Sequence, residues 1–173
     1  MKHLKALTFP SLMITLTLMI TACGWHLRGV TPLPKVLEHI AISSKASQSF
    51  NERLEQQLSF NGSHISFGSA GDIKEGGSQP QFKSFLSISR INVERRTLSI
   101  NSLGQAAEYE LDVTLNAQLI TPNQDYRWEL NVNRTFTNDS NNVVATESEQ
   151  QTQILEVEQQ LVNQLMRRLQ KAK

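Results

Sequence analysis

The residues with the clearest chemical potential stand at Ile20-Thr21-Ala22-Cys23, where an apolar N-terminal segment ends. Cys23 is the only cysteine of the chain, and a thiol directly after two small residues is placed to receive diacylglycerol. Cleavage between Ala22 and Cys23 then makes the acylated cysteine the new N-terminus. Since two or more acyl chains hold a protein firmly in a bilayer, the sequence predicts acyl chains on Cys23 and no other cofactor.

The segment before Cys23 has the three parts of a secretory signal peptide. Lys2 and Lys5 give a basic start, residues 6–20 are mostly apolar and carry no charge, and small residues close the segment. It is too short and too weakly flanked to be a membrane-spanning helix. Its end is similar to the bacterial lipobox. The alternative is an ordinary signal peptide that happens to precede a cysteine.

These signals divide the chain into three parts. We expect a lipoprotein signal peptide over residues 1–22 and an acylated anchor with an extended leader over residues 23–35. The leader contains Pro32 and Pro34, which disfavour helix. Residues 36–173 are then one domain, long enough for a single core. We expect it to be tethered to a membrane and to face the periplasm.

Composition and motifs argue against several other classes of protein. The formal net charge is only +1, whereas a general nucleic-acid binder shows a clear basic excess. The histidines that follow the signal peptide, His26, His39 and His64, stand at no metal-ligand spacing. No Gly-x-Ser-x-Gly turn accompanies a base. We therefore expect neither an enzyme nor a metal site.

A second group that could do chemistry is basic. Arg95 and Arg96 lie on one predicted strand, and Arg134 lies on another, on its apolar side. The strand order brings all three toward the end of the sheet that holds the first turn. They could be structural, through cross-strand pairing with Glu108 or Glu110 and an Arg134 stem that covers apolar surface. Alternatively they form an anion site, because guanidinium groups fit phosphate.

Strands must position these arginines. Residues 36–43 and 64–67 read as short strands, and residues 82–100 as a long strand whose apolar positions change parity, which requires a bulge. Alternation is most regular over residues 107–119, which predicts a sheet with one buried face. After a turn at Pro122-Asn123, the next strand continues the apolar face. Its parity is satisfied by pairing Thr121 with Tyr126, which would put Val113 opposite Arg134.

Two helices are predicted to cover that face. Ser49 with Glu52 forms a capping box, an apolar stripe of Phe50, Leu54 and Leu58 follows, and Asn61-Gly62 ends the helix. A glycine-rich segment over residues 68–81 is predicted to be a loop. From about Thr146 the chain reads as a helix to its end. Its stripe is Ile154, Val157, Leu161, Leu165 and Leu169, thickened by Leu155, Val162 and Met166.

The order strand, helix, strands, helix predicts an α+β fold. We expect two layers, an antiparallel sheet of about four strands packed against two helices.

Short motifs in the same order as these elements make the chain similar to the family of the LPS-assembly lipoprotein LptE (RlpB). They span nearly the whole chain after the signal peptide. The motifs are Cys23-Gly24-Trp25-His26-Leu27-Arg28, Pro32-Leu33-Pro34, Leu58-Ser59-Phe60-Asn61-Gly62, Gly104-Gln105-Ala106-Ala107-Glu108-Tyr109, Arg134-x-Phe136 and Gln164-Leu165-Met166-Arg167-Arg168-Leu169.

The resemblance implies a lipoprotein of the Gram-negative outer membrane that sits as a plug in the β-barrel of LptD. The pair would insert lipopolysaccharide into the outer leaflet. Family members are described as binding lipopolysaccharide through basic residues near the turn end of the sheet. The turn at residues 101–104 has no basic residue here, so Arg95, Arg96 and Arg134 are the candidates. The alternative is a free-standing lipoprotein that binds another envelope ligand.

Overall fold

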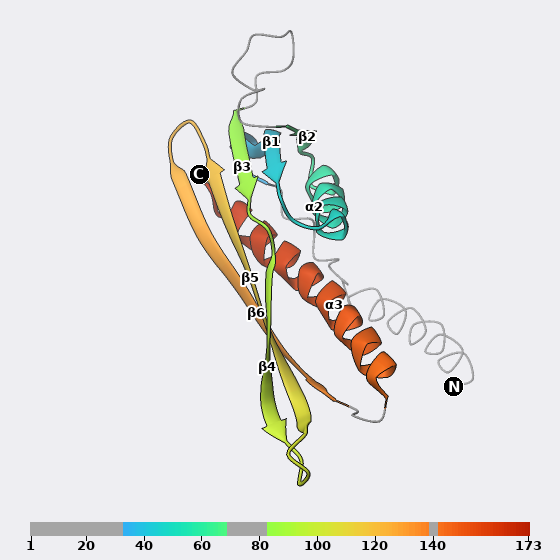
Figure 1. Ribbon diagram of the computed structural model, residues 1–173. Coiled ribbons are helices and arrows are strands. Elements are labelled where there is room, and N and C mark those ends of the chain that lie inside the picture. Colours follow the sequence, from blue (N-terminus) through green and yellow to red (C-terminus); the bar gives the residue numbers. More distant parts are fainter. Residues whose placement is uncertain (1–32, 69–82, 139–141) are drawn as a thin grey trace, which may run out of the picture. The chain divides into compact units, whose positions relative to one another are not determined.

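The computed structural model describes residues 33–68, 83–138 and 142–173 (Figure 1). The predicted signal peptide, Cys23 and all but the first residue of the predicted 68–81 loop lie outside the described residues. Among the described residues, no helix is long and apolar enough to cross a membrane. The elements are β1 His39–Ser44, α2 Gln48–Phe60, β2 His64–Phe67, β3 Ser84–Ile88, β4 Asn92–Ile100, β5 Ala106–Ile120, β6 Asp125–Thr137 and α3 Val143–Leu169.

The class is α+β, as predicted, but the sheet is larger and mixed. Its six strands run β2-β1-β3-β5-β4, with β6 on the other edge of β5. β1 pairs in parallel with both β2 and β3, whereas all pairs that involve β5 are antiparallel. The parallel pairing of β1 with β2 follows from the α2 crossover, because a helix between two neighbouring strands lets the second run in the same direction as the first. The expectation of about four antiparallel strands was therefore incomplete.

The first predicted strand begins later than expected. Lys35–Leu37 form a short 3₁₀ turn in which the Leu37 amide donates to the Pro34 carbonyl over 2.8 Å. The strand then runs from His39 to Ser44.

The predicted change of parity in the long strand is confirmed as a break between β3 and β4. Ile88 pairs with Ala117 of β5, and pairing resumes at Asn92 with Thr114. Between these two pairs the β3–β4 side contains one residue more than β5. The extra residue reverses which alternate side chains of this strand face the core. At the break the Ser89 side chain replaces a strand carbonyl, since its Oγ accepts from the Asn116 amide over 3.0 Å.

The β5–β6 hairpin has the predicted parity but a different register. Leu119 pairs with Tyr126, and Val113 pairs with Val132 rather than with Arg134. The pairing of Thr121 with Tyr126 was wrong because the turn is tighter. The Thr121 amide donates to the Gln124 carbonyl over 2.9 Å, which leaves only two residues between them.

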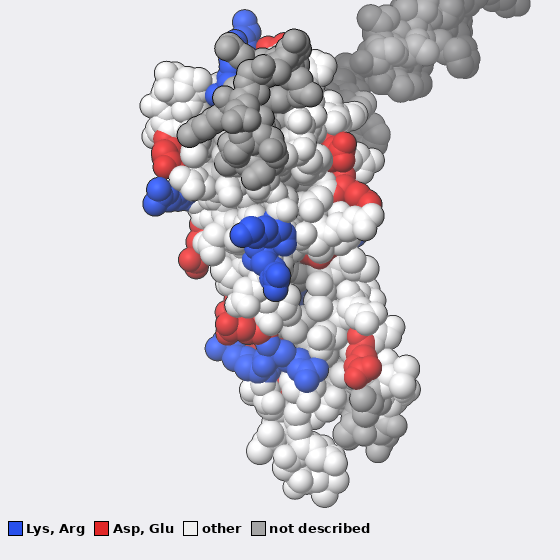
Figure 2. Space-filling model, turned by 45° about the horizontal axis from the view of Figure 1, so that its top comes forward, with Lys and Arg blue, Asp and Glu red and all other residues white. Residues whose placement is uncertain are grey.

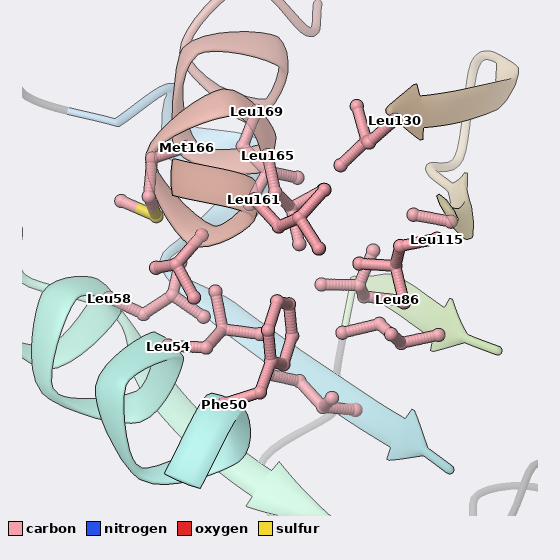
Figure 3. Close-up of a cluster of buried hydrophobic side chains, with 14 of the residues drawn as sticks. Phe50, Leu54, Leu58, Leu86, Leu115, Leu130, Leu161, Leu165, Met166 and Leu169 are labelled. Carbon is pink, nitrogen blue, oxygen red and sulfur yellow. The ribbon is translucent and has the colours of Figure 1, made fainter. Parts of the chain in front are cut away.

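Both helices pack on one face of the sheet and enclose the core (Figure 3). The α2 stripe of Phe50, Leu54 and Leu58 is fully buried, as predicted. On α3 the apolar stripe is also buried from Val157 onward, but Leu155 is 45% exposed and does not belong to the core. In Figure 3 side chains of the two helices and of the strands converge on one space. The opposite face carries no described helix and is called the bare face below.

The helix ends differ from the predictions in detail. α2 is capped by Ser47, whose Oγ accepts from the Phe50 amide over 3.2 Å, so the proposed Ser49–Glu52 capping box is wrong. Asn61 ends the helix as predicted, and Gly62 follows with a φ of 87°, a conformation that favours glycine. α3 begins three residues before Thr146, because the Asn142 side chain caps it by accepting from the Ala145 amide over 3.1 Å.

Candidate functional site

Two of the three candidate arginines stand in one row across the sheet. Arg95 of β4 pairs with Leu111 of β5, and Leu111 pairs with Arg134 of β6. Leu111 is a fully buried core residue, so both guanidinium-bearing residues belong to the face that the helices cover. The row therefore places one cation on each side of an apolar position beneath the first half of α3.

Arg95 is exposed but held by two contacts. Its guanidinium carbon lies 4.7 Å from the centre of the Tyr109 ring, within the range of a cation–π contact. Its Nη1 donates to Oε1 of Gln150 on α3 over 2.8 Å. A hollow of about 370 Å³ adjoins these residues, and Thr146 and Glu147 at the start of α3 also line it. Arg95 thus spans from the sheet to the helix beside an open space.

Arg134 is half-buried at the opposite end of the row. Among the described residues, its buried Nε has no hydrogen-bond partner. It lines a hollow of about 350 Å³ with Gln153 and Glu156 of α3. A buried N–H group without a partner is costly, so this donor is available to an acceptor that enters the hollow. Each hollow also contains one carboxylate, Glu147 or Glu156, which moderates its positive charge.

Arg96 lies on the bare face and is already paired. Its Nε donates to Oε2 of Glu110 over 2.6 Å, and the two residues are directly opposite in the β4–β5 register. This hydrogen bond lowers the pKa of the Glu110 carboxyl; burial opposes it, and the hydrogen bond from Asn133 and the charge of Arg96 add to the lowering. The same hydrogen bond and the charge of Glu110 raise the pKa of Arg96. The structure therefore separates Arg96 from Arg95 and Arg134.

Comparison with known proteins identifies the family. The family model for LptE, described as lipopolysaccharide-assembly, matches residues 37–169. The LPS-assembly lipoprotein LptE of Pectobacterium atrosepticum is 30% identical over 164 residues, which cover 92% of this chain and 83% of that protein. The same-named protein of Photorhabdus laumondii is 28% identical over 162 residues, with 92% and 84% covered. The chain belongs to the LptE family.

Solved structures agree with the LptE-family fold. The rare lipoprotein B of Shewanella oneidensis superposes with a TM-score of 0.61 at 18% identity, over 75% of this chain and 91% of that one. A minor lipoprotein of Acinetobacter baumannii gives 0.59 at 16% identity, over 79% and 93%. At such identities the likeness shows the fold alone, and it supports the α+β arrangement described above.

One buried polar cluster of this LptE-family domain was not predicted. Glu158 of α3 is only 4% exposed, and its carboxylate accepts from the hydroxyls of Ser47 (2.6 Å) and Ser49 (2.5 Å) at the start of α2. Arg53 lies 3.9 Å from it and donates to the Leu155 carbonyl over 2.6 Å. Nothing in the sequence distinguishes Glu158 from its exposed neighbours except its place beside the apolar stripe.

Metal-ligating residues do not gather in the part of the chain that the structure describes. No group of three or more His, Cys, Asp or Glu side chains there could hold a metal ion. His39 and His64 stack at 5.0 Å between ring centres, because they pair directly in the β1–β2 register. Cys23 and Ala22 lie outside the described residues.

Proposed function

We propose that this LptE-family protein is a non-enzymatic lipoprotein of the outer membrane that occupies the β-barrel of LptD. Together they insert lipopolysaccharide into the outer leaflet. The family match over residues 37–169 is the observation that carries the proposal. Acyl chains on Cys23 tether the domain on the periplasmic side, as the apolar segment that ends in Thr21-Ala22-Cys23 indicates.

The bare face of the sheet supports the plug arrangement. Interiors of outer-membrane barrels are polar, so a domain inside one needs polar side chains on the surface that meets the wall. Thr114, Asn116 and Gln118 alternate along β5 on this face, and Gln118 donates to the Asp125 carboxylate over 2.9 Å. A helix-free, hydrogen-bonding surface of this kind suits a polar wall.

Arg95 and Arg134 support direct contact with lipopolysaccharide, which carries phosphates on an acylated sugar. The two cations flank the apolar Leu111 position, and Arg134 has a buried donor without a partner among the described residues. A guanidinium–phosphate hydrogen bond is charge-assisted and strong. Arg96 contributes less in this proposal, because Glu110 already neutralises it on the other face.

Co-purification from solubilised outer membranes tests the barrel partner. We expect the tagged full-length protein to bring down LptD in a stable one-to-one complex. Insertion of bulky side chains at Thr114 and Asn116 should reduce the yield while thermal melting of the free domain stays unchanged. Recovery of the protein only as a monomer would instead support a free-standing lipoprotein.

Lipopolysaccharide binding tests the arginine pair. The double variant Arg95→Gln/Arg134→Gln should bind lipopolysaccharide at least about tenfold more weakly, since each charge-assisted bond contributes about 1.5–3 kcal/mol. Arg96→Gln is the control, because it removes one arginine charge at the same end of the sheet but on the other face. Equal binding by a double variant that melts like the wild type would disprove the site.

A further inference from the structure

The bare face contains a basic groove, of which the proposed function uses only Asn116 and Gln118 and none of the cations. This open groove has a volume of about 830 Å³ and lies at the junction of β3 and β4. Its lining includes Lys45, Arg90 and Arg127. Of its described lining residues only Glu129 is acidic. On the face shown in Figure 2, several Lys and Arg side chains lie next to one another. The groove is therefore a site of net positive charge.

Strand register explains why the groove has a polar floor. Ser43 of β1 pairs with Ser87 of β3, Ser87 with Gln118 of β5, and Gln118 with Arg127 of β6. Residues that pair directly share a face of the sheet. Two hydroxyls, an amide and a guanidinium thus form one row across four strands, on the face away from the helices.

The break between β3 and β4 supplies two residues of the groove lining, Ser89 and Arg90. Ser89 donates its amide to the Asn116 carbonyl over 2.9 Å and accepts from the Asn116 amide at Oγ, and regular pairing resumes only at Asn92. Bulges of this kind redirect side chains and occur often beside functional sites. Arg90 is the residue that follows Ser89 in this bulge.

Two of the three cations are unneutralised. Arg127 lies 3.4 Å from the Asp125 carboxylate, whereas the exposed side chains of Lys45 and Arg90 have no ion pair with any residue that the structure describes. This differs from Arg96 on the same face, which has Glu110. The positive charges of Lys45 and Arg90 can therefore interact with an anionic ligand.

We propose that this groove binds a phosphorylated saccharide. Its volume lies within the range of about 300–1,000 Å³ typical of small-molecule sites, far more than one phosphate ion fills. Lys45 and Arg90 would hold the phosphate, and the Ser87 hydroxyl and the Gln118 amide would bond sugar hydroxyls. The site lies on the face opposite to Arg95 and Arg134, so this proposal does not depend on the site proposed for those two residues.

Such chemistry occurs both in the saccharide of lipopolysaccharide and in simple sugar phosphates, and calorimetry can separate these sources. The probes are deacylated lipopolysaccharide saccharide, the same saccharide after phosphatase treatment, glucose 1-phosphate and inorganic phosphate, each titrated into the full-length acylated protein in detergent. We expect the phosphorylated saccharide to bind more tightly than its dephosphorylated form and than inorganic phosphate. Preference for glucose 1-phosphate would identify the simple sugar phosphate as the source.

Variants locate the binding. Lys45→Gln/Arg90→Gln should weaken binding of the phosphorylated saccharide about tenfold or more at low salt, while Arg96→Gln on the same face leaves it unchanged. Co-purification of LptD with the double variant reports separately on the proposed function. Equal binding by the double variant, equal binding of the dephosphorylated saccharide, or displacement of the saccharide by a poly-glutamate peptide of equal charge would overturn the proposal.

Discussion

The two ends of the sheet are built differently. At the end that contains β1, β2 and β3, Phe50, Leu54 and Leu58 of α2 and Leu161 and Leu165 of α3 are fully buried. At the other end the β4–β5 hairpin exposes its apolar side chains, with Leu98 at 51%, Ile100 at 67% and Leu103 at 81%. One end encloses a core between two layers, and the other extends past it (Figure 1).

This difference separates stability from surface chemistry. Burial of apolar area is the main favourable contribution to folding. Most of the buried apolar side chains lie between the two helices and the part of the sheet that they cover. The hairpin end is held largely by strand hydrogen bonds and cross-strand pairs such as Arg96–Glu110. Residues there can change to suit a partner or lipid at little cost to the fold. Arg95, Arg96 and Arg134 lie toward that end, whereas the basic groove lies toward β1 and β3.

The largest effect is expected from a cavity in the core. Leu54→Ala should lower the free energy of unfolding by about 2–5 kcal/mol, because it removes buried methyl groups and leaves a cavity between α2 and the sheet. Urea denaturation of the domain measures this. The control is Leu103→Ala at the hairpin tip, which is 81% exposed and should leave the midpoint almost unchanged. Similar losses for both variants would contradict the division into two ends.

A smaller loss is expected when the buried carboxylate is neutralised. Glu158→Gln weakens two hydrogen bonds from Ser47 and Ser49 and the contact with Arg53. Hydrogen bonds to charged groups contribute about 1.5–3 kcal/mol each, so we expect the free energy of unfolding to fall by about 1–3 kcal/mol. Glu149→Gln, an exposed position on the same helix, is the control. If both variants have the same free energy of unfolding, the contacts of Glu158 do not stabilise the packing of α2 on α3.

Much of the fold follows from local patterns. Alternation over residues 107–119 predicted β5, the stripe of Phe50, Leu54 and Leu58 predicted the buried side of α2, and the parity change in the long strand predicted the bulge at Ser89. Each of these patterns is produced directly by burial on one face. Parity also placed Arg134 on the helix-covered side correctly.

What local patterns could not determine depends on contacts distant in sequence. A register shift of two residues preserves parity, so nothing in the alternation distinguished Thr121–Tyr126 from the observed Leu119–Tyr126 pair. The cap is Ser47 rather than Ser49 because the helix already begins at Gln48, and both hydroxyls donate to Glu158, a carboxylate more than one hundred residues away. Arg95 and Arg96 were grouped because the strand order puts them toward the same end of the sheet, yet adjacent strand residues face opposite sides.

The smallest effect concerns the Arg96–Glu110 pair at the hairpin end, and it depends on pH. The folded-state pKa of Glu110 is lowered by its hydrogen bond with Arg96, so the pair stabilises the fold above the ordinary glutamate pKa and loses this contribution as pH falls through the folded value. Arg96 is exposed and Glu110 is partly exposed, so the gain is small and salt weakens it. We expect Glu110→Gln to be slightly less stable than the wild type at neutral pH, and the difference to be smaller at about pH 3, below the ordinary glutamate pKa. Urea denaturation at the two pH values measures this, with Glu129→Gln as a bare-face control. A difference that persists or grows in acid would mean that Glu110 acts through packing rather than through its charge.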